Sequence, residues 1–121
     1  MKILIIEPDP VEGDTLRSQL SAEPGIQVLL ESKAAAALAT HKNESPDVVV
    51  ADAGMTYGNE FVITLLKSQS PQIPVIAVKS VSAKSKESVI KSSNLVMIRP
   101  FKPEELLTVI VRLITMAKFF S

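Results

Sequence analysis

The chain has 121 residues, with 13 Lys and Arg against 13 Asp and Glu, one His and no Cys, and 46% of its residues are hydrophobic. The absence of cysteine excludes disulfides and zinc ribbons, and the zero net charge excludes the broad positive field that non-specific binding to nucleic acid or an anionic membrane requires. Residues 1–121 are therefore predicted to form one compact domain with neither of these partners.

Five short apolar runs predict five strands, because runs of Val, Ile and Leu with little polar alternation are typical of strands covered on both faces. The runs are Ile3–Ile6, Ile26–Leu30, Val48–Ala51, Val75–Val78 and Leu95–Ile98. A helix is predicted after each run, over Pro10–Ala22, Lys33–Lys42, Glu60–Ser68, Ala83–Lys91 and Pro103–Phe120. Strands joined by helices run parallel, so this order predicts an α/β fold, a doubly wound parallel sheet with helices on both sides.

The N-terminal part carries signals of location and of a helix start. The run Ile3–Ile6 is far shorter than a signal peptide or a spanning helix needs, so a cytoplasmic location is expected. Asp9 is a suitable N-cap because a proline follows it at the first helical position. This helix is expected to present Val11, Leu16 and Leu20 on its apolar face.

The single histidine, His41, lies near the end of the second predicted helix among polar neighbours. We expect it to be exposed and without a functional role.

Polar side chains follow four of the predicted strands at the edge of the sheet where chemistry gathers in this architecture. They are Glu7 and Asp9 after the first strand, Asp52 after the third, Lys79 and Ser80 after the fourth, and Arg99 after the fifth. Acids and bases that meet there could coordinate Mg²⁺ and handle a phosphoryl group. Most polar residues at strand ends only begin a loop, but a carboxylate that ends a fully buried strand, as Asp52 does, needs a further reason.

Four segments in order resemble a response-regulator receiver domain of the CheY-like type. They are Lys2–Pro10, Pro46–Asp52, Pro74–Ile76 and Arg99–Leu107. The resemblance spans the chain, and the four segments together are specific although none is so alone. It implies a flavodoxin-like (βα)5 fold with strand order 2-1-3-4-5, in which a partner histidine kinase phosphorylates the aspartate at the end of the third strand. Asp52 matches that aspartate.

The resemblance also implies a magnesium site and a set of catalytic side chains. The implied metal ligands are Glu7, Asp9, Asp52 and Gly54, and the implied catalytic residues are Asp52, Arg99, Lys79 and Ser80. Pro8 stands where the second acid of the family's acidic pair would be, and Asp9 comes one residue late. Magnesium binding is therefore predicted to be weak or absent unless Asp9 can swing in.

The cations of the predicted site also depart from the family pattern. Lys79 stands where the family has Thr or Ser, although a shift of one residue would place Ser80 there instead. Arg99 replaces the family's lysine, and a planar guanidinium prefers bidentate contacts with carboxylates. Lys79 or Arg99 could therefore neutralise Asp52 without Mg²⁺, which gives a pseudo-receiver that works without phosphorylation as the alternative to a phosphorylated switch.

The last predicted helix has an apolar arc wider than one face of a sheet buries. The stripe predicted to pack on the sheet is Leu106, Val109, Ile110, Leu113, Met116, Ala117 and Phe120. A second stripe, Leu107, Val111 and Ile114, is covered either by neighbouring elements or by a second copy in a homodimer formed through the fourth helix, fifth strand and fifth helix. The resemblance favours the dimer. The apolar end at Phe119 and Phe120 suggests the N-terminal part of a longer protein.

Two other functions are alternatives for this fold. A phosphotransferase of the haloacid dehalogenase type needs Asp-x-Asp where Glu7 and Asp9 stand, and it usually needs a cap domain. A flavodoxin-like cofactor-binding module needs a phosphate loop at the same place, where these two acids would repel a phosphate. We therefore favour a signalling module that is not an enzyme and whose output is a protein–protein contact.

Overall fold

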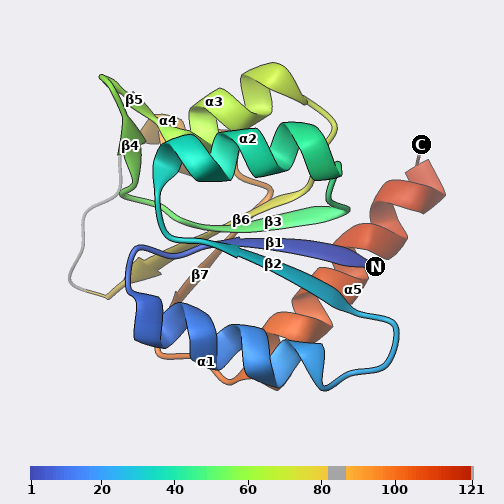
Figure 1. The fold of residues 1–121 in the computed structure, drawn as a ribbon. Helices are drawn as coiled ribbons and strands as arrows, with labels where there is room; N and C mark the ends of the chain where they lie inside the picture. Colours follow the sequence, from blue (N-terminus) through green and yellow to red (C-terminus); the bar gives the residue numbers. More distant parts are fainter. Residues whose placement is uncertain (82–86, 121) are drawn as a thin grey trace.

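The computed structural model describes residues 1–81 and 87–120, without the side chain of Phe120. In these residues a five-stranded parallel sheet lies between two layers of helices (Figure 1). In spatial order its strands are β2 (Gln27–Glu31), β1 (Lys2–Ile6), β3 (Val48–Asp52), β6 (Val75–Ser80) and β7 (Leu95–Arg99). The helices are α1 (Pro10–Ser21), α2 (Ala34–Glu44), α3 (Val62–Gln69), α4 (Glu87–Ser92) and α5 (Pro103–Phe120).

The predicted fold is confirmed, since β6 and β7 are the fourth and fifth strands of the sheet in chain order. A short antiparallel hairpin, β4 (Thr56–Tyr57) and β5 (Glu60–Phe61), was not predicted. It takes the first residues of the predicted third helix, so α3 begins only at Val62. The fourth helix is described from Glu87, and the predicted residues before it lie outside the described part of the chain.

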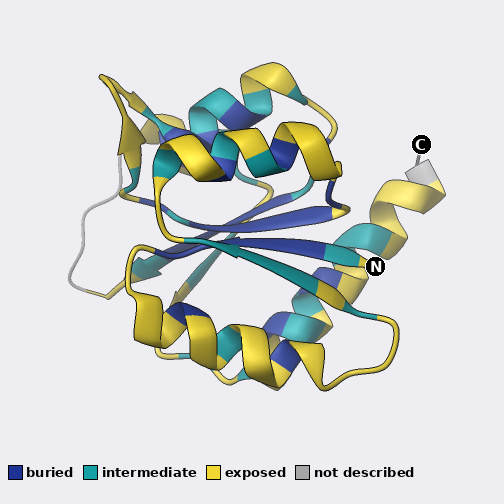
Figure 2. Ribbon diagram, in the orientation of Figure 1, coloured by how far each residue is buried: buried dark blue, intermediate teal, exposed yellow. Residues whose placement is uncertain are grey.

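The core has two halves, one on each face of the sheet. Figure 1 shows α2, α3 and α4 on one face and α1 and α5 on the other. In β1, Leu4 and Ile6 pack toward the first group of helices and Ile3 and Ile5 toward the second. Both faces of the central strands are therefore buried (Figure 2), which explains why their sequences lack polar alternation.

The first helix meets the core through fewer residues than predicted. Leu20 is fully buried and Leu16 is partly buried against the α1/α5 half of the core. Val11 is 74% exposed, so its predicted place on the apolar face is wrong. The physical reason is position, because the first turn of α1 lies beside the loop that leads into α5 rather than over the strands.

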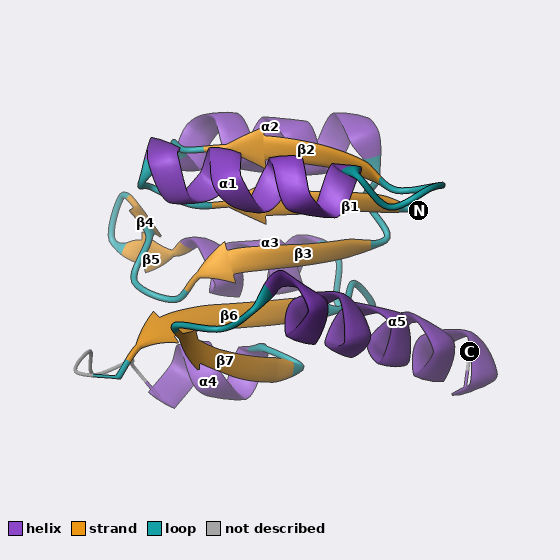
Figure 3. Cartoon of the chain, turned by 90° about the horizontal axis from the view of Figure 1, so that it is seen from below, coloured by secondary structure: helices purple, strands orange, loops and turns teal. Residues whose placement is uncertain are grey.

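The last helix is longer than the sheet that it covers. Leu106 and Ile110 are fully buried, whereas Met116 is 55% exposed and Ala117 is exposed, so the prediction that these two residues pack on the sheet is wrong. The last turns of α5 run past the end of the sheet, as Figure 3 shows. Phe120, in the same predicted stripe, has no described side chain.

The second apolar stripe of α5 is partly covered within the chain. Leu107 and Ile114 pack against the α1/α5 half of the core, while Val111 is 46% exposed. Across residues 1–81 and 87–120, no helix combines the length and the apolar character that are needed to cross a membrane.

Candidate functional site

Three of the predicted site residues come together at the carboxyl edge of the sheet. Ile6 of β1 pairs with Ala51 of β3, so Glu7 and Asp52 follow paired residues on neighbouring strands. Arg99 ends β7, which is separated from β3 by β6. A long side chain is needed to bridge that distance, and the guanidinium of Arg99 reaches both carboxylates.

The Arg99 guanidinium is the centre of this cluster. Its Nη2 donates hydrogen bonds to Glu7 Oε2 at 2.5 Å and to Asp52 Oδ1 at 3.1 Å. Burial alone would lower the pKa of Arg99, but the hydrogen bonds and charges of Glu7 and Asp52 outweigh it and raise that pKa. The guanidinium is therefore charged at neutral pH.

A third carboxylate, which sequence reasoning missed, also contacts Arg99. Glu12 in the first turn of α1 places its Oε2 3.5 Å from Arg99 Nε. Acidic residues are common in the first turn of any helix because the positive end of the helix dipole stabilises their negative charge. Nothing in the sequence therefore distinguished Glu12 from an ordinary solvated side chain.

The carboxylates of the cluster are well supplied with donors. The second oxygen of Asp52, Oδ2, accepts the backbone N–H of Gly54 at 3.0 Å, so both of its oxygens are engaged. Glu7 accepts the backbone N–H of Asp9 at 3.2 Å through Oε1. The Glu7 side chain is only 7% exposed, so its charge depends on these partners for compensation.

Asp9 serves the helix rather than the cluster. Its Oδ1 accepts the backbone N–H groups of Val11 at 2.9 Å and Glu12 at 3.4 Å, which confirms it as the N-cap of α1. A capping carboxylate is tied to the helix end, so swinging toward Asp52 would cost the cap.

The structure does not bring Lys79 to Asp52. Across the β6–β7 pair, Lys79 lies opposite Ile98 and Ser80 lies opposite Arg99. Because side chains alternate along a strand, Ser80 shares a sheet face with Arg99 and Lys79 projects to the other. Among the described residues, neither side chain forms a hydrogen bond or ion pair with Asp52. Of the two predicted cations, the one that meets Asp52 is therefore Arg99.

The donors at this edge do not fit a bound Mg²⁺ as they are arranged. Magnesium ions take one or two carboxylates with free oxygens, together with water and phosphate oxygens. Here Glu7 and Asp52 share one guanidinium, Pro8 supplies no carboxylate, and Asp9 caps a helix. Within the described part of the chain, no three His, Cys, Asp or Glu side chains are grouped so that they could hold a metal.

The expectation that His41 is exposed is wrong. Its side chain is turned inward, the residue is 6% exposed, and within the described residues its Nδ1 has no hydrogen-bond partner. Ala37, four residues earlier on the same helix face, is also buried, so this face of α2 packs inward. The polar neighbours of His41 in the sequence concealed this. Burial lowers the pKa of His41, because it disfavours the charged ring.

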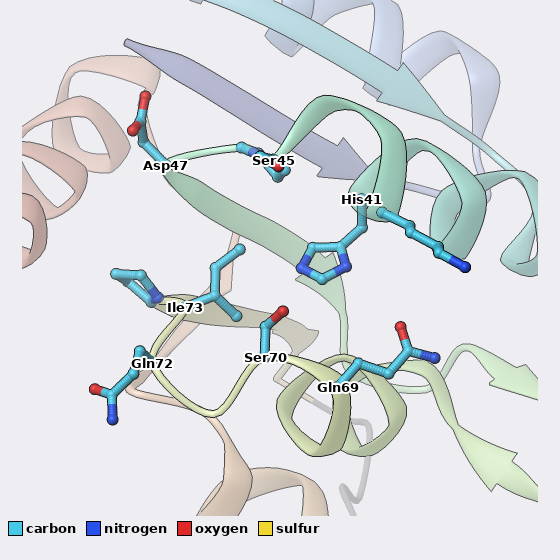
Figure 4. Close-up of a pocket in the computed structure, with 10 residues that line it drawn as sticks. His41, Ser45, Asp47, Gln69, Ser70, Gln72 and Ile73 are labelled. Carbon is cyan, nitrogen blue, oxygen red and sulfur yellow. The ribbon is translucent and has the colours of Figure 1, made fainter.

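His41 lines a cavity with a volume of about 750 Å³ (Figure 4). Other lining residues are Ser45, Asp47, Gln69, Ser70 and Ile73. They belong to the segments that enter β3 and β6, whereas Asp52 and Arg99 are the last residues of β3 and β7. The cavity therefore lies at the opposite edge of the parallel sheet from the Arg99 cluster.

Comparison with known proteins gives a consistent result. Residues 3–111 match the family described as response regulator receiver domain. A comparison with curated protein sequences finds no match. A CheY-like receiver domain protein from Methanospirillum hungatei JF-1 is similar in structure, with a TM-score of 0.85, 20% identity, and 99% of this chain and 98% of that chain covered.

Two other solved structures are also similar. A response regulator receiver domain protein from Clostridium thermocellum has a TM-score of 0.82 and 20% identity, with 99% of this chain and 98% of that chain covered. NtrX from Brucella abortus has a TM-score of 0.85 and 23% identity over 98% of this chain, which spans 28% of the NtrX chain. At these identities the solved structures support the fold alone.

Proposed function

We propose, for a chain that belongs to the response regulator receiver domain family, that Asp52 is the phosphoacceptor and that output passes through protein–protein contact. Receiver domains are signalling domains that interact with histidine kinases and other signalling proteins. The observation that carries the proposal is the position of Asp52, which ends a buried central strand beside Glu7 and Arg99. In the transfer, an Asp52 oxygen attacks phosphorus, the bond from phosphorus to the donor breaks, and the donor leaves with that electron pair.

Intact mass after incubation with acetyl phosphate and millimolar Mg²⁺ tests this proposal. We expect the wild type to gain one phosphoryl group and Asp52→Asn to gain none, because the amide cannot form an acyl phosphate. Asp14→Asn, which removes an exposed aspartate of α1, is the matched control and should behave like the wild type. No gain in the wild type would favour the alternative, a pseudo-receiver that works without phosphorylation.

Receiver domains generally bind Mg²⁺ at their acidic site. In this chain we propose weak binding, supported by the proline at position 8 and by the capping role of Asp9. Both features remove a carboxylate from the reach of a metal beside Asp52.

We also propose a homodimer through α4, β7 and α5, as the predicted interface of Leu107, Val111 and Ile114 implies. Exposed apolar side chains lie on the edge strand β7 and on the two helices named here, namely Leu95 and Ile98 of β7, Ile90 of α4 and Val111 of α5. Leu107 and Ile114 are partly packed in the core, so Val111 and Ile98 are the residues to change.

Sedimentation should give a dimer for the wild type and a monomer for Val111→Glu with Ile98→Glu, because two buried charges cannot be solvated in the interface. Val11→Glu, on the exposed start of α1, is the control. A mass unchanged by the double substitution would count against this surface.

Other statements remain predictions from the sequence. They are the cytoplasmic location, the absence of nucleic-acid and membrane partners, and the expectation that residues 1–121 form one domain. The haloacid dehalogenase and flavodoxin-like alternatives are not favoured, since residues 3–111 match the receiver family.

A further inference from the structure

We infer that the Arg99 guanidinium takes the place of the divalent cation between Glu7 and Asp52, and that Glu12 positions it there. This inference rests on the proposed receiver function, because it concerns how the charge of the candidate phosphoacceptor Asp52 is balanced. It makes the cation of the site a part of the chain rather than a bound ion.

The Nη2 atom of Arg99 occupies the position between the two carboxylates. This one nitrogen donates to carboxylates from two neighbouring strands, at 2.5 Å to Glu7 and 3.1 Å to Asp52. A metal between these two carboxylates would compete with Arg99 for Glu7 Oε2 and Asp52 Oδ1, because the other two oxygens accept the backbone N–H groups of Asp9 and Gly54. Magnesium must therefore displace the guanidinium, and its binding becomes a competition between an external ion and a tethered one.

The planar shape of the arginine side chain lets it contact all three carboxylates. A guanidinium has donors in a fixed planar fork, so it can contact Glu7 and Asp52 through Nη2 while Nε faces Glu12. A lysine ammonium is a point charge without this fork. Because Glu12 is on α1, while Glu7 follows β1 and Asp52 ends β3, the three carboxylates hold the guanidinium from two structural layers.

The role of Glu12 is positional rather than strongly energetic. Its side chain is more than half exposed and its oxygen lies 3.5 Å from Nε, and an exposed ion pair of this kind contributes little stability. Its contact with Nε limits rotation of the planar group and keeps Nη2 directed at Glu7 and Asp52.

A magnesium titration at constant ionic strength tests the competition. The amide resonances of Glu7, Ala53 and Gly54 report binding, and no phosphoryl donor is present. We expect the midpoint of Arg99→Leu to fall by about tenfold or more relative to the wild type, because the occupied carboxylates become free. Arg112→Leu removes an equal charge from an exposed position of α5 and should leave the midpoint unchanged. Equal midpoints for Arg99→Leu and the wild type would overturn the inference.

A second variant, Arg99→Lys, provides the test if Arg99→Leu does not fold. Arg99→Lys keeps the charge but loses the fork, so its midpoint should fall by about threefold. If Arg99→Leu does not fold, an unchanged midpoint in Arg99→Lys overturns the inference instead. Failure of Asp52 to accept a phosphoryl group would leave these midpoints as they are, so failure of the inference and failure of the proposed function can be told apart.

Exchange of the Arg99 Nε–H proton with solvent tests the positioning role of Glu12. We expect Glu12→Gln to speed this exchange about threefold or more, since the amide is a weaker acceptor than the carboxylate. In an Arg99→Leu background, the same substitution should change the magnesium midpoint less than about twofold, because only an exposed charge is lost. An Nε–H exchange rate that is the same in Glu12→Gln and the wild type would remove Glu12 from the cluster.

Discussion

Arg99→Leu is expected to lower the free energy of unfolding by about 2–4 kcal/mol at neutral pH. The substitution leaves Glu7, whose side chain is 7% exposed, next to Asp52 with no cation between them. Removing one partner of a fully buried ion pair costs about 3–5 kcal/mol, and the partial exposure of Arg99 and Asp52 lowers the expected cost here. Urea unfolding of the two proteins measures the difference.

Two further variants show whether this loss comes from the unpaired carboxylate. Arg112→Leu, an exposed change of equal charge, should stay within about 0.5 kcal/mol of the wild type. Glu7→Gln combined with Arg99→Leu should recover part of the loss, because the remaining buried group is then neutral. A double variant as unstable as Arg99→Leu alone would mean that the loss comes from packing and not from charge.

Magnesium is expected to stabilise Arg99→Leu more than it stabilises the wild type. A ligand that binds only the folded state raises stability by mass action. Arg99→Leu is therefore expected to gain stability in millimolar Mg²⁺, while the wild type changes little because Arg99 already lies between the carboxylates. Equal gains in the two proteins would show that the metal binds elsewhere.

The fold was predictable because the parallel sheet is buried on both faces. That burial gives five continuous apolar runs. Because a helix that connects two parallel strands crosses over with a right-handed turn, few arrangements of the strands then remain. The meeting of Glu7, Asp52 and Arg99 followed from the same fact, because parallel strands that neighbour one another end at one edge. For these three residues, strand order alone was sufficient.

Features that depend on side-chain direction or on the length of an element were not predictable. Lys79 and Ser80 are adjacent in the sequence and project to opposite faces, so the exact end of β6 decides which of them shares a face with Arg99. Met116 continues the helical spacing of apolar residues in α5, but it lies past the end of the sheet and is exposed. The spacing of residues within one helix does not show where the neighbouring sheet ends. Glu12 meets Arg99 only through the docking of α1.

Acid is expected to destabilise the protein through His41, the only histidine in the chain. Burial lowers its pKa in the folded state below the ordinary value of 6.5, so the unfolded chain takes up a proton first as the pH falls. The stability associated with the neutral ring is complete above about pH 6.5 and is lost as the pH falls through the folded-state pKa. The slope from this one group is at most about 1.4 kcal/mol per pH unit.

The cause of this loss lies in the surroundings of the ring. Protonation adds charge to a residue that is 6% exposed and makes Nδ1, which has no partner among residues 1–81 and 87–120, a buried donor. Such a donor costs about 1–3 kcal/mol. The C-terminal end of α2 and the Asp47 carboxylate favour a positive ring, Lys42 opposes it, and all three border the same cavity. Burial lowers the pKa of His41 and so sets the direction of the shift.

His41→Phe separates this effect from the titration of the carboxylates. Phenylalanine keeps a planar ring, has no Nδ1 to satisfy and does not titrate, while every Asp and Glu remains in place. The variant should be at least as stable as the wild type at pH 7, and its stability should fall less steeply between pH 6.5 and pH 5. Urea midpoints of the two proteins across this range measure the difference between their slopes. Parallel curves would mean that the His41 ring reaches solvent and that its burial is not maintained in solution.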